Sequence, residues 1–363
     1  MDLPNDPVID CDVHAVVPSV AALVPFLPEY WREQISQSGL KGPVDHWYPP
    51  QLPTSVRADA KPSGGLPAAS NVAQIVRDVL EAAPHPALAV LNCDYAVETL
   101  HNPDAALAFA AATNEWLASE WLAKDARLRA SIVVPSQFPD LAVREIDRMA
   151  KRKGFVQVLL PVRSEQPYGS RNFRPVFAAA ARHGLPVALH FGGAPGNAST
   201  PVGWASLYLE DYAGMSGAFQ TQLISIIAGG VFDEHPGLKL VLAEGGFAWL
   251  PSLLWRFDKN WKGLRREIPW VRRPPSEYAR EHVRLTIAPT DAPPSFAEAS
   301  EGRPQPGQLG DILQQLGSDE MLLYASDYPH AHGDIGADAA WAAISPEILR
   351  RIKSDNPRAL YRL

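Results

Sequence analysis

Residues of the types that commonly bind metal ions stand at the ends of four short apolar runs in the sequence. Asp12 and His14 stand two positions apart at the end of the first run. Three later runs have a residue of the same kind at or just after their ends: His190, Glu244 and Asp327. Because side chains alternate between the two faces of a strand, Asp12 and His14 should project from one face, which a shared metal ion requires. The sequence therefore predicts a divalent metal centre.

Each of these residues, taken alone, also has a structural explanation. A histidine such as His190 can be a hydrogen-bonded core residue. Glu244 precedes two glycines and a predicted helix, where the helix dipole favours a negative charge. Asp327 has the chemistry of an N-cap or turn residue. We favour metal binding because four separate runs end in side chains that can be ligands.

Eight short apolar runs indicate the elements that position these residues. They are 8–11, 87–92, 130–134, 155–160, 186–190, 239–243, 283–287 and 321–325. Segments with helical spacing lie between most of them: 103–123, 141–152, 174–183, 219–232, 247–265 and 308–316. Continuous apolarity is typical of parallel strands buried on both faces. The pattern predicts a (β/α)8 TIM barrel, with residues 1–363 as a single domain.

Two proline-rich segments, 37–66 and 289–310, interrupt this alternation. We interpret both as loops inserted at the C-terminal mouth of the barrel. The rival architecture, a doubly wound domain followed by a second module, is disfavoured because no glycine-rich phosphate motif follows the first run.

Composition narrows the partners and the compartment. The chain has 33 Lys and Arg against 40 Asp and Glu, a net charge of −7, and no basic block, so nucleic acid is not an expected partner. No apolar stretch is long enough to cross a membrane, and the first residues do not resemble a signal peptide, so we expect a cytoplasmic protein. Cys11 and Cys93 lie inside apolar runs, which predicts two core thiols.

Four motifs resemble the amidohydrolase superfamily, in particular the branch related to aminocarboxymuconate-semialdehyde decarboxylase. They are 9–14 (IDCDVH), 185–193 (LPVALHFGG), 237–246 (GLKLVLAEGG) and 324–330 (YASDYPH). The resemblance implies a metal-dependent barrel enzyme that acts on a small molecule and forms a homodimer. It also implies metal-binding roles, which fall on Asp12, His14, His190 and Asp327.

The chain departs from the branch at two of these positions. Asp12 stands where the first histidine of a His-x-His motif is usual. Glu244 replaces a histidine before Gly-Gly that the resemblance identifies as an acid/base group in decarboxylases. This second departure argues against decarboxylation. Glu244 is then either a base or a metal ligand.

The charges at the predicted centre bear on the number of ions. Asp12, Glu244 and Asp327 would bring about three negative charges next to two neutral histidines. Two divalent ions with a bridging hydroxide would bring such a buried site close to neutrality. We therefore predict two ions, with iron, manganese or zinc as candidates for this set of nitrogen and oxygen ligands.

These observations predict a metal-dependent hydrolase in which metal-activated water attacks an amide, ester, lactone or acyl-thioester carbonyl. Asp327 would orient or deprotonate the water, Glu244 would bridge to a second ion or act as a base, and His330 would protonate the leaving group. Weaker candidates contact the substrate: Tyr208, Tyr212, Trp249 and His332. Two alternatives are a nonoxidative decarboxylase of an aromatic or unsaturated carboxylic acid, and a barrel that binds metal or ligand without turnover.

Overall fold

Eight parallel strands form one sheet in which each strand pairs with its neighbour in the sequence. The computed structural model describes residues 6–43, 55–62, 64–193, 196, 198, 200–291, 308–331 and 337–363. The strands are β1 (Ile9–His14), β2 (Leu88–Asn92), β3 (Leu128–Val133), β4 (Phe155–Pro161), β5 (Val187–His190), β6 (Leu240–Ala243), β7 (Val283–Thr286) and β8 (Leu322–Leu323). Each of the eight predicted runs overlaps one of these strands, although β1, β3 and β4 extend beyond the predicted bounds.

Backbone hydrogen bonds between β1 and the segment after β8 close the barrel. The N–H of Cys11 donates to the carbonyl of Tyr324 at 2.9 Å, and the N–H of His14 donates to that of Tyr328 at 2.8 Å. Val13 and Tyr328 form a parallel bridge. The predicted (β/α)8 barrel is confirmed.

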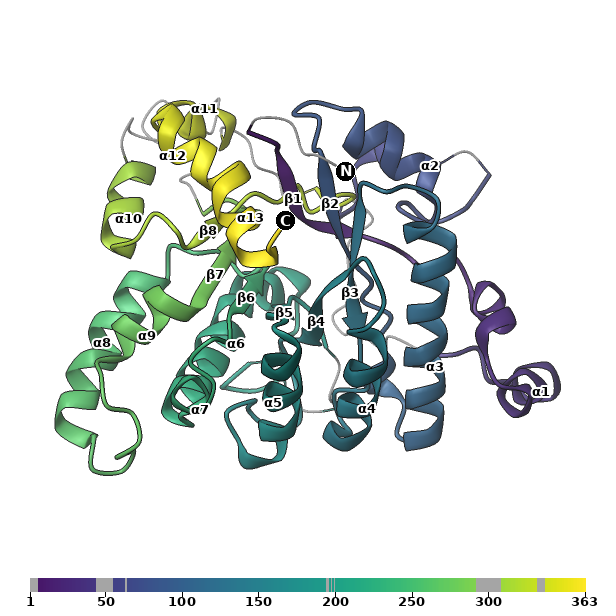
Figure 1. The fold of residues 1–363 in the computed structure, drawn as a ribbon, viewed down its shortest axis with the longest axis horizontal. Coiled ribbons are helices and arrows are strands. Elements are labelled where there is room, and N and C mark those ends of the chain that lie inside the picture. Colours follow the sequence, from purple (N-terminus) through teal and green to yellow (C-terminus); the bar gives the residue numbers. More distant parts are fainter. Residues whose placement is uncertain are drawn as a thin grey trace.

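Helices surround the strands (Figure 1). They are α1 (Glu29–Gln37), α2 (Val72–Ile75), α3 (Pro103–Trp116), α4 (Pro139–Met149), α5 (Arg174–His183), α6 (Tyr208–Ala228), α7 (Val231–Glu234), α8 (Leu250–Leu264), α9 (Pro275–His282), α10 (Gln308–Leu316), α11 (Ala337–Ala342), α12 (Pro346–Arg350) and α13 (Asn356–Tyr361). The predicted bounds of α5 and α10 agree with the structure. The α6 helix begins eleven residues before the predicted segment 219–232.

The apolar core has an inner part and an outer part. The inner cluster contains side chains from six strands, such as Cys11, Val90 and Val241, together with Leu360 and Tyr361 of α13. Because this cluster takes no residue from the helices between strands, it fills the barrel interior, and α13 contributes to it from one end. The larger outer cluster packs the strands against the surrounding helices.

One extra residue in β1 decides which of its side chains enter the barrel. In the pairing of β1 with β2, Ile9 lies opposite Leu88 and His14 lies opposite Asn92. The register shifts by one residue between Asp10 and Val13. Ile9 and Cys11 belong to the inner cluster, whereas Val13 belongs to the outer one. Strict alternation from Ile9 would have pointed His14 at the helices. The bulge restores the inward direction before the strand ends.

Other predictions have mixed outcomes. Cys11 and Cys93 are buried free thiols, as predicted. Much of the insertion at 37–66, and most of that at 289–310, lies outside the described residues, and the single-domain assignment stays a prediction. Within the described ranges, no helix has both the length and the apolar character needed to cross a membrane.

We predict that Gly169→Ala destabilises the fold. A Cβ at Gly169 would lie 1.9 Å from the carbonyl oxygen of Ser225, in the backbone of α6, so the helix must move. We expect the free energy of unfolding to fall by about 1–3 kcal/mol, the range for overpacking, as measured by urea denaturation. Gly237→Ala is the matched control, because nothing lies within 4 Å of its added Cβ. Equal stability of the two variants would contradict the prediction.

Candidate metal centre

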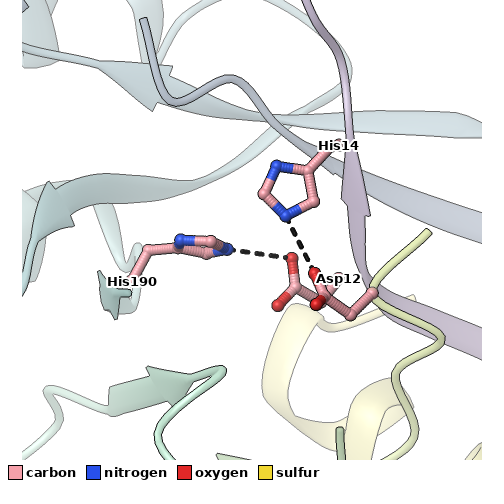
Figure 2. A group of neighbouring side chains, drawn as sticks. Asp12, His14 and His190 are labelled. Atoms are coloured by element: carbon pink, nitrogen blue, oxygen red, sulfur yellow. Dashed lines mark hydrogen bonds and ion pairs between the residues drawn. The ribbon is translucent and has the colours of Figure 1, made fainter. Parts of the chain in front are cut away.

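Three elements at the C-terminal ends of the strands bring four ligand-type side chains together. Asp12 and His14 end β1, His190 ends β5, and Asp327 follows β8. One ligand atom from each of the four lies within 4.8 Å of the others. Figure 2 shows the side chains of Asp12, His14 and His190 pointing toward one another. All four residues are buried.

Each carboxylate of this group contacts one of the histidines. Nε2 of His14 lies 2.8 Å from Oδ1 of Asp327, and Nε2 of His190 lies 3.3 Å from Oδ1 of Asp12. The two imidazole rings meet edge to face, with centroids 5.0 Å apart. Nδ1 of His190 lies 2.8 Å from the carbonyl oxygen of Phe191, which leaves Nε2 directed at Asp12.

The second oxygen of Asp12 indicates what is missing from the group. Oδ2 of Asp12 is buried and has no hydrogen-bond partner. A buried carboxylate oxygen without a donor is costly unless a cation compensates it. Together with Asp12, the carboxylate of Asp327 and the imidazoles of His14 and His190 form a set of nitrogen and oxygen ligands that suits a divalent ion. The residues present therefore fit a metal ion.

The two carboxylates that follow strands β6 and β8 adopt an unusual backbone conformation. Glu244 has φ 62° and Asp327 has φ 51°, a left-handed region that residues other than glycine seldom adopt. The N–H of Glu244 donates to Oγ1 of Thr286 at 2.9 Å. The N–H of Asp327 donates to the carbonyl of Asp12 at 3.0 Å. These bonds hold both residues at the barrel mouth in spite of the strain.

A second group overlaps the first. His14, Glu244, Asp327 and His330 also place ligand atoms within 4.8 Å of one another. Nδ1 of His330 lies 3.1 Å from Oδ2 of Asp327. The centroids of the His330 and His14 rings are 4.3 Å apart. Burial lowers the pKa of His330, but the charge and the hydrogen bond of Asp327, together with the charge of Glu244, outweigh burial and raise the pKa to about 9. In the absence of a metal ion, this imidazole therefore holds a proton at neutral pH.

The histidines of the first group differ in their protonation. Burial and the neighbouring His330 lower the pKa of His14. Burial also opposes the charged form of His190, but the charge and hydrogen bond of Asp12 and the charges of Glu244 and Asp94 together outweigh burial, so the pKa of His190 is raised. A metal ion must therefore displace a proton from His190, whereas His14 is ready to bind.

The predicted substrate-contacting residues lie in different places. The rings of Tyr208 and Tyr212 are 5.6 Å apart on the first turns of α6, and Tyr212 contacts Phe191 after β5. Burial, followed by the negative charge of Glu244, raises the pKa of Tyr208 to about 12. The indole of Trp249 instead donates to the carbonyls of Gly245 and Gly246. His332 lies outside the described residues.

Three polar residues that the sequence analysis did not select adjoin the centre. Asn92 donates to Oδ1 of Asp12 at 2.7 Å. Oδ1 of Asp10 accepts the N–H groups of Asp12 and Ser326 and so ties β1 to the segment before Asp327. The Asp94 carboxylate approaches Gly192, where an added Cβ would lie 2.6 Å from Oδ2. Asn92 and Asp94 stand at the end of the second apolar run, so the rule that found Asp12 would also have found them.

Comparison with known proteins agrees with this architecture. The amidohydrolase family model matches residues 9–363. The chain is 28% identical over 288 residues to gamma-resorcylate decarboxylase from Rhodococcus jostii (strain RHA1), covering 74% of this chain and 80% of that protein. An amidohydrolase from Mycobacterium avium subsp. paratuberculosis K-10 has a similar structure, with a TM-score of 0.72, 21% identity and coverage of 99% and 100%.

A third similar protein has been solved with a metal ion. It is 5-carboxyvanillate decarboxylase from Novosphingobium aromaticivorans DSM 12444, complexed with manganese and 4-hydroxy-3-methoxy-5-nitrobenzoic acid. The TM-score is 0.66 at 19% identity, and the alignment covers 99% of this chain and 97% of that one.

The predicted hydrolase activity is wrong. The curated relatives that share about a quarter of their residues with this chain are decarboxylases. The inference failed because it treated the replacement of a histidine by Glu244 as the loss of an acid/base group. The structure places the imidazole of His330 in the same group as Glu244, so the site still has a histidine that can carry a proton.

We predict that Asp12→Asn lowers the metal content of the purified protein. The substitution keeps the shape of the side chain but removes the negative charge that a divalent ion would compensate. We expect a loss of at least half of the bound metal, measured by elemental analysis of protein purified without chelator. Asp147→Asn removes a surface carboxylate on α4 and serves as the control. Full metal content in Asp12→Asn would contradict this assignment.

Proposed function

Because the chain belongs to the amidohydrolase family, we propose that it is a metal-dependent, nonoxidative decarboxylase of a hydroxylated aromatic carboxylic acid. The observation that carries the proposal is the buried group of Asp12, His14, His190 and Asp327, with its unpartnered Asp12 oxygen. The activities of the similar proteins supply the reaction and the substrate class.

One ion fits the arrangement better than the two that the charges had suggested. The two groups of ligand atoms share His14 and Asp327. One imidazole nitrogen binds a single metal ion, so two groups that share His14 do not supply two independent sets of ligands. The first group is complete with two histidines and two carboxylates. Manganese suits this set and is bound by the solved carboxyvanillate decarboxylase.

Loss of carbon dioxide makes one demand on the protein. The bond between the ring and the carboxyl carbon breaks, its electron pair stays on the ring, and a proton must be delivered to that ring carbon. The bound ion supplies Lewis acidity toward oxygen atoms of the substrate. The products are carbon dioxide and the arene that carries the new proton.

His330 is the residue suited to deliver that proton. Its Nδ1 faces the Asp327 carboxylate, at 3.2 Å from Oδ1 and 3.1 Å from Oδ2. This contact orients the ring, and the imidazolium carries the proton that is transferred. Its side chain is 23% exposed, so it can exchange the proton with solvent between turnovers.

Glu244 has a different task in this scheme. It lies in the group with His330 rather than in the group that we assign to the ion. We assign Glu244 as a base that accepts a hydrogen bond from a ring hydroxyl of the substrate. Tyr208, Tyr212 and Phe191 provide aromatic surface on the α6 side, against which a ring would stack. The homodimer stays a prediction.

The reaction is tested by its gaseous product. We expect the manganese-loaded protein to release carbon dioxide from 2,6-dihydroxybenzoate or 5-carboxyvanillate. Release should fall at least 100-fold after removal of the ion with chelator and return when manganese is added back. Carbon dioxide and the decarboxylated arene are both quantified, the latter by liquid chromatography. Absence of both products from a panel of hydroxybenzoates, with the metal site full, would overturn the proposal.

Glu244→Gln separates a base from a metal ligand. As a base, Glu244 is dispensable for the ion, so the variant should keep about one metal equivalent per chain while kcat falls roughly 100- to 10,000-fold. Metal content and turnover are measured on the same preparation, with Asp12→Asn as the variant expected to lose both. Two equivalents in the unaltered protein, with a loss in Glu244→Gln, would instead support the binuclear centre.

A further inference from the structure

We propose that the C-terminal helix α13 positions the metal ligand Asp12 through a chain of buried hydrogen bonds along the barrel interior. Tyr361 begins this chain and Asn92 ends it. The inference rests on the proposed function only in assigning Asp12 to the ion. It adds positioning residues that touch neither the ion nor the substrate.

The chain passes through three neighbouring strands. Asn92 of β2 donates from its amide nitrogen to Oδ1 of Asp12 at 2.7 Å. Ser131 of β3 donates to Oδ1 of Asn92 at 2.5 Å. Gln157 of β4 donates to the same Asn92 oxygen at 3.2 Å and to Oγ of Ser131 at 2.8 Å. Tyr361 of α13 donates its hydroxyl to Oε1 of Gln157 at 2.9 Å.

Because these residues are buried, each of them depends on its neighbours in the series for its hydrogen bonds. Asp12, Asn92, Ser131 and Gln157 have no exposed surface. Apolar side chains of the inner cluster, including Leu159 and Val90, flank them along β4 and β2. A polar group that loses its partner here has no bulk water to replace it. The orientation of each amide therefore depends on the next one.

The direction of every bond follows from Asp12. The carboxylate oxygen Oδ1 of Asp12 accepts, and Asn92 presents its amide nitrogen to it. The Asn92 oxygen then faces Ser131 and Gln157, which must both donate. This arrangement turns Oε1 of Gln157 toward Tyr361, which must donate in its turn. Burial raises the pKa of Tyr361 well above its usual value, so the phenol keeps the proton that this bond needs.

The chain keeps the two oxygens of Asp12 distinct. Oδ1 is engaged by Asn92 and lies near His190, whereas Oδ2 has no hydrogen-bond partner. The hydrogen bond to Oδ1 restricts rotation of the carboxylate, and so it favours one direction for the other oxygen. Such outer contacts orient metal ligands and affect affinity for the ion.

The helix at the far end of this series of hydrogen bonds is held by contacts of its own. The amide of Asn356, at the start of α13, donates to the carbonyls of Asp319 and Leu322, both at 2.9 Å. The ring of Tyr361 packs in the inner cluster. The helix is therefore fixed to the segment around β8 while its last residue reaches into the barrel. This anchoring gives Tyr361 a defined position from which to orient Gln157.

The test compares metal affinities of Asn92→Ala and Tyr361→Phe. Manganese is titrated calorimetrically into metal-free protein, so the result does not depend on turnover. We expect Asn92→Ala to bind manganese about 10- to 100-fold more weakly, the range for partners of metal ligands. Tyr361→Phe removes only the hydroxyl, and we expect a smaller loss, up to about 10-fold.

Tyr278→Phe is the matched control. Tyr278 is a buried tyrosine of α9, and it takes no part in the series of hydrogen bonds that ends at Asp12. Its hydroxyl donates to Asp233 at 2.6 Å. Both tyrosine variants should unfold at a lower temperature than the unaltered protein, but only Tyr361→Phe should bind manganese more weakly. If the two lose stability and keep the same affinity, Tyr361 is merely structural and the inference is overturned.

A double variant tests whether the residues act in series. If Tyr361 acts through Asn92, Asn92→Ala with Tyr361→Phe should bind no more weakly than Asn92→Ala alone. Additive losses would overturn the series arrangement. Failure of the unaltered protein to bind manganese would instead overturn the proposed function, so the two failures are distinguishable.

Discussion

Two carboxylates without exposed surface, Asp12 and Asp327, constrain the rest of the barrel mouth. A buried negative charge is tolerated only where hydrogen bonds or cations compensate it. Asn92, His14 and His190 supply part of this compensation, and the bulge in β1 supplies the geometry that brings Asp12 and His14 into the interior. The oxygen that remains uncompensated is the one that a divalent ion would bind.

The barrel interior changes character along its axis for the same reason. Apolar side chains and the ring of Tyr361 fill the end covered by α13. Above them, Asn92, Ser131 and Gln157 form a polar layer on adjacent strands. Asn92 donates to the buried Asp12 carboxylate, and Ser131 and Gln157 donate to the oxygen of Asn92. The layer thus links a helix at one end of the barrel to chemistry at the other.

The case of Glu244 shows how far a motif can be interpreted. A histidine replaced by glutamate at one strand end suggests that an imidazole has been lost. The imidazole of His330, from the segment after β8, lies in the same group as Glu244. Chemistry at a barrel mouth depends on which groups converge, and a segment after a different strand can provide a group that one motif lacks.

Local properties of the sequence were enough for the strands and for the group of ligand-type side chains at the barrel mouth. Apolar runs predict buried strands because burial on both faces leaves no place for polar side chains, and residues at run ends such as His190 and Asp327 converge in any closed parallel barrel. The bulge in β1, the contact of Asn92 with Asp12 and that of Tyr361 with Gln157 are different. They depend on register and on the path of a distant helix, which are set by packing of the whole chain, so only the tertiary structure decided them.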